Sequence, residues 1–417
     1  MAHVIPRDAR FTVETTFAEN QADWGNGAPI KIIEPSFDLT REEADNENIT
    51  PRRQAVLDLV PGLKSGSTFA HSMYMTASGI NAADQGTAVA TNESEILLAA
   101  LGGRTLGLRA DLDGGGSAAA PTVATDPGFA NGDWAFGWDD SAATGRFVRI
   151  DDVSSSPTLT LLDPLLAAPT ADDVLYACIT SYSDELSHDH TSANYTTLGW
   201  LVQGEHVDDV FAMRGCKPTV SIEGIAAGER VKYNLEYLVA GWPDVQPTKA
   251  ALGDPSGIAP LTVATGAKAT ILIADVGSPL AAVDCRGSVD IELGVSWGQL
   301  MVPCATANGE GVKGYISEIT PATLTLRVAF DDVAFVAEYL AGTKKHCLIQ
   351  IGDQPTNATA IYFGNLEYMA RPQRADEGGE TITELVFRAQ EDPGDTTGLT
   401  GNDLAQRRAP FVLLATA

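Results

Sequence analysis

The residues from Gly294 to Gly298 (GVSWG) fit the GxSxG pattern that presents a nucleophilic serine in many hydrolases. Asp331 and His346 follow Ser296 in the order in which such enzymes carry their acid and their base. The pattern works only where a strand turns sharply into a helix and exposes the serine. Here the next residues include a proline and carry no helix signal, and strands and helices do not alternate around them. The sequence therefore predicts no hydrolase site, and we expect no catalytic residue.

Two other segments contain side chains that metal ions prefer. His188 and His190 would share one face of a strand, where two imidazoles can bind one ion, but the sequence offers no assignable third ligand. The run that begins Asp111-Leu-Asp113-Gly is similar to a calcium loop, yet Thr122 occupies the twelfth position, where such loops need an acid. No glycine-rich phosphate loop lies between a strand and a helix. We therefore expect no metal and no cofactor.

The charge balance limits the partners of the chain, because its formal net charge at pH 7 is -28. Nucleic-acid binding depends on Lys and Arg contacts to phosphates, so an acidic surface lets polyanions slide past without sticking. Solubility at high concentration and a salt-adapted host are alternative explanations of the acidity. No apolar run is long enough for a transmembrane helix, and the first residues lack the apolar core of a secretory signal. The five dispersed cysteines form no zinc pattern and fit a reducing cytoplasm.

One β-rich unit occurs twice along the chain. The segments Gly215–Ala240 and Gly364–Ala389 each open with glycine and a strand. Each turns at a Gly-Glu pair, at Gly228 or Gly379, and returns as a strand with alternating apolar residues. With 40 glycines and 22 prolines spaced between short strands, the chain fits an all-β plan. The repetition indicates two tandem domains of one kind.

Each half also predicts one short amphipathic helix that ends at glycine. The first runs from Asn92 to Leu101, and the second from Asp331 to Ala341. In the second helix Val333, Val336 and Leu340 are expected to face inward. Because a helix this short is not stable alone in water, each must lie on its own sheet.

The predicted fold class is mainly β, with two tandem β-sandwich or barrel domains, one short helix in each, and a small β insert in the first. In order, we expect an N-terminal arm (1–30), a first domain (31–103 and 193–242), a small inserted β domain (104–192), a linker (243–283), a second domain (284–392) and a C-terminal arm (393–417). The last residues of that arm are apolar and could add a strand to a neighbour.

Several of these segments resemble parts of the tail tube proteins of long-tailed viruses. Phe211 to Trp242 resembles the terminal hairpin of that family, and the helix at Asn92, ending in Gly102-Gly103, resembles its single helix. Gly132 to Leu165, with FVRIDDV and TLTLLDPL, resembles a small β insert of its longer members. The resemblance covers nearly the whole chain and rests on patterns rather than on signature residues.

The resemblance implies a β-sandwich whose inner sheets join between subunits into a barrel around a channel. Members with one such domain form hexameric rings, so two domains in one chain imply homotrimeric, pseudo-hexameric rings that stack into a tube. The implied partners are other copies of this chain, DNA and a tape-measure protein held in the lumen without specific binding, and tail terminator and distal tail proteins at the tube ends, with no membrane. The protein would be assembled in the host cytoplasm and reside in the virion tail.

Two groups of residues are candidates for these roles. The expected inter-ring contacts lie in one charged loop and comprise Arg41, Glu42, Glu43, Asp45, Arg52 and Arg53. The expected lumen residues lie on the returning strands of the two hairpins and comprise Glu229, Lys232, Asn234, Glu236, Glu380, Thr381, Thr383 and Glu384.

Three alternatives to the tube remain open. The same fold could form a single tail terminator or baseplate ring. The chain could instead be a bacterial surface adhesin of Ig-like domains, which the absent signal and unpaired cysteines disfavour. An enzyme acting through Ser296 is the most distant alternative.

Overall fold

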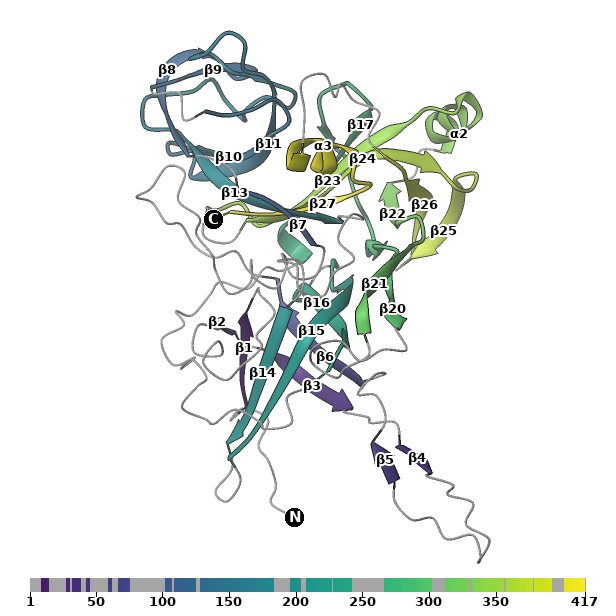
Figure 1. Cartoon of the computed structure of the whole chain (residues 1–417). Helices are drawn as coiled ribbons and strands as arrows, with labels where there is room; N and C mark the ends of the chain where they lie inside the picture. Colours follow the sequence, from purple (N-terminus) through teal and green to yellow (C-terminus); the bar gives the residue numbers. More distant parts are fainter. Residues whose placement is uncertain are drawn as a thin grey trace, which may run out of the picture.

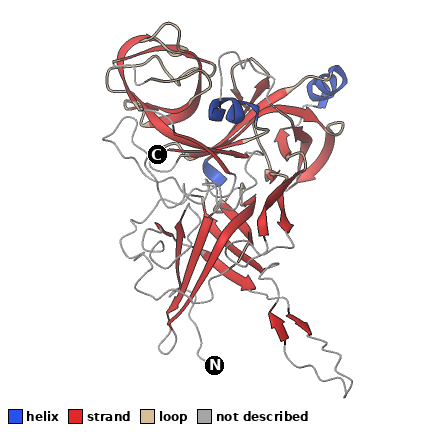
Figure 2. Cartoon of the chain, in the orientation of Figure 1, coloured by secondary structure: helices blue, strands red, loops and turns tan. Residues whose placement is uncertain are grey.

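The computed structural model is mainly β, and its strands pair antiparallel throughout the described chain (Figures 1 and 2). The structure describes residues 9–14, 28–30, 32–38, 43–45, 59–61, 67–75, 102–106, 109–124, 128–183, 196–203, 208–226, 228–241, 266–301, 312–329, 332–355, 358–377, 379–391 and 401–416. The predicted mainly β fold class is confirmed.

The first run of strands forms a sheet in the order β2–β1–β14–β15–β16–β6–β3. Its strands are β1 (Ala9–Glu14), β2 (Ala28–Ile30), β3 (Ile33–Asp38), β6 (Ser67–Tyr74), β14 (Thr196–Gln203), β15 (Asp208–Glu223) and β16 (Lys232–Val239). A separate hairpin of β4 (Glu43–Asp45) and β5 (Leu59–Pro61) lies in sequence between β3 and β6. We call this set the first repeat.

The second run of strands repeats this order as β18–β17–β23–β24–β26–β22–β19. Its strands are β17 (Ala269–Asp275), β18 (Ala281–Ala282), β19 (Asp290–Glu292), β22 (Thr323–Ala329), β23 (Lys345–Ile351), β24 (Thr359–Tyr368), β25 (Gln373–Glu377), which pairs with β26, and β26 (Glu380–Ala389). A hairpin of β20 (Val295–Met301) and β21 (Val312–Ile319) lies between β19 and β22. We call this set the second repeat. Each strand of the first sheet has a counterpart at the same place in the second, and the hairpin β4–β5 corresponds to the hairpin β20–β21.

The two hairpins singled out in the sequence turn through glycine for a steric reason. Gly228 and Gly379 have φ angles of +84° and +89°, which residues with a side chain disfavour.

Part of the segment expected as a linker (243–283) forms strands instead. Residues 269–275 and 281–282 of it form β17 and β18, because Ala269–Asp275 is apolar enough to pair with β23 inside the sheet.

Helix α2 (Asp332–Ala341) ends at Gly342, whose φ is +66°, as predicted. The expected inward face is wrong, because Val333 and Leu340 are 78% and 77% exposed. Phe335 and Tyr339 pack against the core instead, since two aromatic rings one turn apart bury more apolar area than aliphatic side chains do. The helix expected at 92–101 lies outside the described residues.

A small barrel with its own core lies within residues 102–183 and is the rounded unit in Figure 1. Its strands are β8 (Ala110–Ser117), β9 (Ala120–Val123), β10 (Trp134–Asp139), β11 (Thr144–Asp152), β12 (Thr160–Leu161) and the first part of β13 (Val174–Ser183). Strand β7 (Gly102–Leu106) pairs with the last residues of β13, outside the barrel. The barrel strands follow the order β9–β8–β13–β10–β11–β12. An antiparallel bridge between Thr122, in β9, and Thr158, just before β12, closes the barrel. Its interior is filled by side chains such as Leu112, Val148 and Leu175.

The C-terminal segment differs from the expected arm. Helix α3 (Gly401–Arg408) leads into β27 (Val412–Thr416), which lies between β13 and β24 of its own chain. All five residues of β27 are buried, because a strand that is apolar on both faces is stable only inside a sheet. The segment thus joins the barrel strand β13 to the second repeat, rather than pairing with a neighbouring molecule.

Shortening a buried side chain of β27 tests this placement between β13 and β24. We expect Leu414→Ala to lower the free energy of unfolding by about 2–5 kcal/mol, because the removed methyl groups leave a cavity at a fully buried position. Leu166→Ala, at a residue 53% exposed, should change it by less than about 0.5 kcal/mol. Urea denaturation measures both, and equal effects of the two changes would contradict the placement.

One core cluster spans both repeats, and an ionisable side chain, His71, packs against two of its aromatic residues. His71 on β6 is buried, its ring stacks 5.6 Å from that of Tyr237, and it lies 5.5 Å from that of Phe69. Desolvation lowers the pKa of His71 from 6.5 to about 3, despite the opposing backbone hydrogen bond at Ser72. The imidazole is therefore neutral in the folded protein near pH 7.

The lowered pKa predicts acid destabilisation with a defined window. Because the unfolded chain binds a proton at His71 below about 6.5 and the folded chain does so only below about 3, stability should fall as the pH drops between these values. His71→Phe should flatten that part of the pH dependence. Denaturation midpoints measured from pH 7 to pH 3 check this, and an unchanged slope in the variant would assign the acid sensitivity to other groups.

Candidate assembly interface

The two repeats are joined edge to edge by a short strand pairing. Strand β14 leaves β15 at the pair Thr196–Cys216, and β19 then occupies the same edge of β15 through Ser221–Glu292 and Ile222–Ile291. Since β15 also pairs with β16 on its other side, the sheet runs continuously from the first repeat into the second. We call this the edge junction.

The hairpin β20–β21 fastens the edge junction from one side. The Trp297 Nε1 group donates to the Pro218 carbonyl at 3.0 Å, and Gln299 Nε2 donates to the Val239 carbonyl at 3.0 Å. The Tyr315 hydroxyl donates to the Gly215 carbonyl and lies 3.2 Å from that of Leu238. All of these acceptors are main-chain carbonyls of β15 and β16, so the hydrogen bonds of the hairpin are made to the backbone of the first repeat.

A buried cation lies under this hairpin. The Lys217 side chain is fully buried, and its Nζ atom lies 4.3 Å from the centroid of the Trp297 indole ring. A desolvated ammonium over an aromatic face gains about 2 kcal/mol from the ring quadrupole. The hairpin therefore stabilises the first repeat as well as covering it.

The continuous sheet has one polar and one apolar face. Residues directly opposite each other in antiparallel strands share a face. One such row crosses the sheet through Ser72, Asn234, Ser221, Glu292, Thr323, Arg388 and Glu367. The adjacent row, Met73, Tyr233, Ile222, Ile291, Leu324, Phe387 and Tyr368, is buried in the core. The alternation holds across the edge junction, so both faces continue from one repeat to the other.

Hydrogen bonds between neighbouring strands connect the polar row. Ser72 Oγ donates to Asn234 Oδ1 at 2.7 Å, and Arg388 Nη2 donates to Glu367 Oε2 at 2.9 Å. These side chains lie in fixed register because the backbone pairing beneath them sets their spacing. The face is thus a regular polar surface rather than a cleft.

The polar face is acidic. Its acidic side chains are Glu223, Glu236, Asp290, Glu292, Glu367 and Glu384, and they outnumber the basic side chains Lys232, Arg327 and Arg388. Arg327 forms ion pairs with Asp290 at 2.8 Å and with Glu384 at 3.4 Å, which neutralises part of the charge. An excess of carboxylates remains along the sheet.

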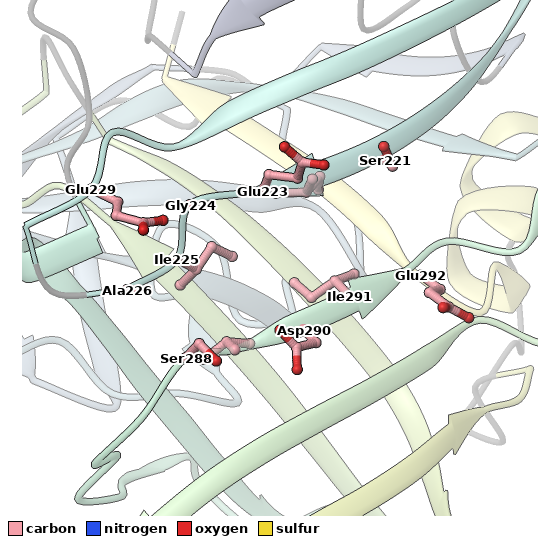
Figure 3. Close-up of a pocket in the computed structure, with 12 residues that line it drawn as sticks. Ser221, Glu223, Gly224, Ile225, Ala226, Glu229, Ser288, Asp290, Ile291 and Glu292 are labelled. Atoms are coloured by element: carbon pink, nitrogen blue, oxygen red, sulfur yellow. The ribbon is translucent and has the colours of Figure 1, made fainter. Parts of the chain in front are cut away.

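A shallow hollow of about 280 Å³ marks the edge junction on this face (Figure 3). It is lined by Glu223, Glu229, Asp290 and Glu292 together with small and apolar residues of β15 and β19. In Figure 3 the four carboxylates point in different directions instead of converging. No cluster of three or more metal-ligating side chains occurs among the described residues. The hollow therefore resembles a seam between strands more than a catalytic pocket.

The described residues of the motifs considered for catalysis or metal binding lie in three different strands, β20, β23 and β8. Ser296 lies within β20 and pairs with Glu318, so the serine is not at a strand-to-helix turn. His346 is buried, 2.8 Å from the Ser278 carbonyl and 3.3 Å from the Tyr362 hydroxyl. Asp113 accepts a hydrogen bond from the Gly115 amide in the barrel. Asp331, His188 and His190 lie outside the described residues.

The cysteines that the structure describes are free thiols, as the sequence suggested. They are Cys178, Cys216, Cys285 and Cys347. Burial raises the pKa of the Cys178 and Cys347 thiols far above the usual value, which keeps them protonated and unreactive. None of the described helices has the length and hydropathy needed to cross a membrane.

Most of the predicted lumen residues lie on one exposed surface. Lys232, Asn234 and Glu236 alternate with buried residues along β16, and Glu384 lies on the same face of β26. Glu229, Glu380 and Thr381 are exposed near the hairpin turns. Thr383 is the exception, because it is fully buried on the core-facing side. Adjacent residues of a strand point to opposite faces, so Thr383 and Glu384 cannot share one.

The predicted inter-ring residues are only partly described. Glu43 and Asp45 lie on β4, opposite Pro61 and Leu59 of β5. Arg41, Glu42, Arg52 and Arg53 lie outside the described residues. The sequence pattern did not predict the residues of the edge junction or of the hairpin β20–β21 that fastens it. The available signal was the pair of aromatic residues, Trp297 and Tyr315, in two strands of alternating pattern.

Comparison with models of known protein families gives no match for this chain, and no curated protein matches it either.

Loss of one indole donor should weaken the fastening of the edge junction. We expect Trp297→Phe to lower the free energy of unfolding by about 1–3 kcal/mol, because the Pro218 carbonyl loses its donor in a buried site. Trp138→Phe, on a half-buried indole of the small barrel, is the matched control and should cost less. Urea denaturation measures both, and a larger loss from the control would contradict the proposed importance of β20–β21.

Proposed function

We propose that the chain is a structural protein that forms three-copy rings, and that these rings stack into the tail tube of a long-tailed virus. The observation that carries the proposal is that the edge junction inside one chain has counterparts at both ends of the same sheet, and that these edges have no strand partner among the described residues. A protein with complementary edges at its two ends is suited to head-to-tail association with copies of itself.

The first unused edge is that of β3. Strand β3 is the counterpart of β19, since Phe37 pairs with Phe69 as Ile291 pairs with Leu324. In the described chain β19 has partners on both sides, β22 and β15, whereas β3 pairs only with β6. Pro35 within β3 fits an edge position in the single chain, because proline has no amide hydrogen to donate.

The second unused edge begins where β23 leaves β24. That departure at Lys345–Leu366 is the counterpart of the departure of β14 at Thr196–Cys216. Beyond Leu366, β24 and β25 pair only with β26 in the described chain, whereas β15 receives β19 at the equivalent place. The outer edge of β25 in one copy is therefore complementary to β3 of the next.

Association through these edges produces a series of alternating repeats. A head-to-tail contact gives a closed ring when its rotation returns to the start, and closure also removes edges that would otherwise aggregate. The resemblance to tail tube proteins supplies the number, because six repeats correspond to three copies of a two-repeat chain. The small barrel would then decorate the ring.

The acidic polar face is suited to the wall of a channel. In the proposed ring the face that contains Asn234, Glu236, Glu292 and Glu384 lines the lumen, and the apolar face packs outward against the rest of each repeat. Carboxylates repel DNA phosphates, so the genome and a tape-measure protein would pass without specific binding. Tail terminator and distal tail proteins would cap the stack. A single terminator or baseplate ring is the second candidate, since the same edges would build it.

Electron microscopy of the purified protein at high concentration tests the proposal. We expect three-fold rings with a central channel, stacked into tubes, because strand pairing and core burial both continue across the junction. Single rings that never stack would favour the terminator or baseplate alternative. A protein that stays monomeric at every concentration would contradict both.

Two proline variants in β3 form the control for that experiment. In an edge strand the amides point alternately to the partner strand and to the free edge, so one of Phe37→Pro and Asp38→Pro removes an amide directed at the next copy. That variant should keep the circular dichroism spectrum of the folded chain and lose the rings in sedimentation. Rings that persist in both variants would assign assembly to another surface.

A further inference from the structure

We infer that the outward face of helix α2 is an interaction surface that the next copy of this chain covers in the ring. This outward face consists of Val333, Ala337, Leu340 and Ala341. The inference rests on the proposed ring, and it adds an apolar contact to the strand pairing at each junction between copies.

The polarity of α2 is the reverse of that of an ordinary surface helix. Val333, Ala337, Leu340 and Ala341 recur at helical spacing and are all exposed, Val333 at 78% and Leu340 at 77%. Glu338 is directed instead toward the body of the second repeat, where it accepts hydrogen bonds from two side chains. A surface helix normally turns its charged residues to water and its apolar residues to the core. An apolar face that points outward is typical of a surface that another protein covers.

The contacts of Glu338 and Tyr339 fix α2 in this orientation. Lys345 Nζ and the Tyr368 hydroxyl each donate to Glu338, both at 2.7 Å. The rings of Tyr339 and Tyr368 meet edge to face, with their centroids 6.3 Å apart. Turning the helix to bury Leu340 would break these contacts, so its outward position is built into the second repeat.

The residue that anchors α2 lies on the edge assigned to the next copy. Tyr368 follows Leu366, where β23 leaves β24, by two residues, as Pro218 follows Cys216, where β14 leaves β15. Across the edge junction, Pro218 is contacted by the other repeat through Trp297. Tyr368 therefore lies where the next copy would arrive. In Figure 1, α2 lies on the same side of the second repeat as β25, whose outer edge would receive that copy.

Exposed apolar side chains gather at this end of the described chain. Five large hydrophobic residues are exposed among the described residues, namely Leu166, Ile316, Val333, Leu340 and Met369. Two of them belong to α2, and Met369 directly follows Tyr368 in the sequence. The other two lie apart, one in the small barrel and one on β21. The end of the second repeat beside β25 thus exposes more large apolar side chains than any other described part of the surface.

Strand pairing alone is too short to hold two copies together. Inside one chain, the pairing of β15 with β19 comprises two residue pairs, and Val295 and Trp297 of the second repeat are buried in the core that the repeats share. Separate copies lack the covalent connection and need about 1,000 Å² of buried surface for a stable contact. The outward face of α2 supplies apolar area on the second-repeat side, and the first repeat of the next copy would cover it.

Substitution of Leu340 tests the inference. Leu340→Glu places a charge in the proposed contact, and the folded chain should keep its circular dichroism spectrum and urea midpoint because the residue is 77% exposed. We expect this variant to lose the rings in sedimentation and under the electron microscope. Leu340→Met keeps an apolar side chain of similar size and should retain them. Leu166→Glu, at a residue 53% exposed in the small barrel, is the matched control and should also retain them.

The outcomes separate the role of α2 from the tube proposal. Rings and tubes that persist in Leu340→Glu would overturn the inference and leave the tube intact. Single rings of Leu340→Glu that no longer stack would place α2 between rings and overturn it as well. Loss of rings in Leu166→Glu would assign the effect to the added charge instead of to α2. Absence of rings in the unchanged protein would overturn the proposed function itself.

Thiol labelling gives a second readout that leaves the assembly intact. Leu340→Cys should react with a maleimide in dispersed protein and lose that reactivity in single rings, whereas Leu166→Cys should react in both. Labelling of the unchanged protein gives the background from its own cysteines. Protection of Leu340→Cys that appears only in stacked tubes would move the contact to a neighbouring ring and overturn the inference.

Discussion

The amide and carbonyl groups along a sheet edge need hydrogen-bond partners, and this constraint governs the arrangement of the molecule. The chain satisfies it internally where β19 occupies the edge that β14 leaves open on β15. Two residue pairs and one further backbone hydrogen bond, from Val289 N to Ile225 O, make this junction, and both faces of the sheet continue through it in register. A shared core beneath Ile222 and Ile291 and a fastening hairpin above Pro218 make so short a pairing stable.

The junction and the core beside it join the two repeats. The apolar row that runs from Met73 to Tyr368 is a single cluster, so separating the repeats would expose core on both sides. The polar row has no such requirement and can face water or a channel. A sheet with one buried apolar face and one polar face in fixed register is suited to the wall of a tube, and equally to any closed ring.

Local pattern predicted parts of the second repeat. The returning strand at 380–389 and the helix that ends at Gly342 follow from alternation and from glycine at positive φ. Long-range pairing was not predictable in this way. The buried strand Val412–Thr416 looked like a free arm because nothing in its own residues names β13 and β24 as partners. The inward face of α2 was wrong because Phe335 and Tyr339, rather than the aliphatic stripe, meet the sheet.

The candidate interface was likewise predictable from local pattern only in part. Alternation along β16 placed Lys232, Asn234 and Glu236 together, but the edge junction arises only once distant strands meet. The main-chain carbonyls that receive Trp297, Gln299 and Tyr315 have an evolutionary consequence. Apart from Lys217, whose ammonium lies against the Trp297 ring, hydrogen bonds to the backbone place little selection on the identity of the side chains in β15 and β16, so those strands can change in sequence while their pairing persists. Two descendants of one ancestral unit can then retain a common architecture after their sequences have diverged almost beyond recognition.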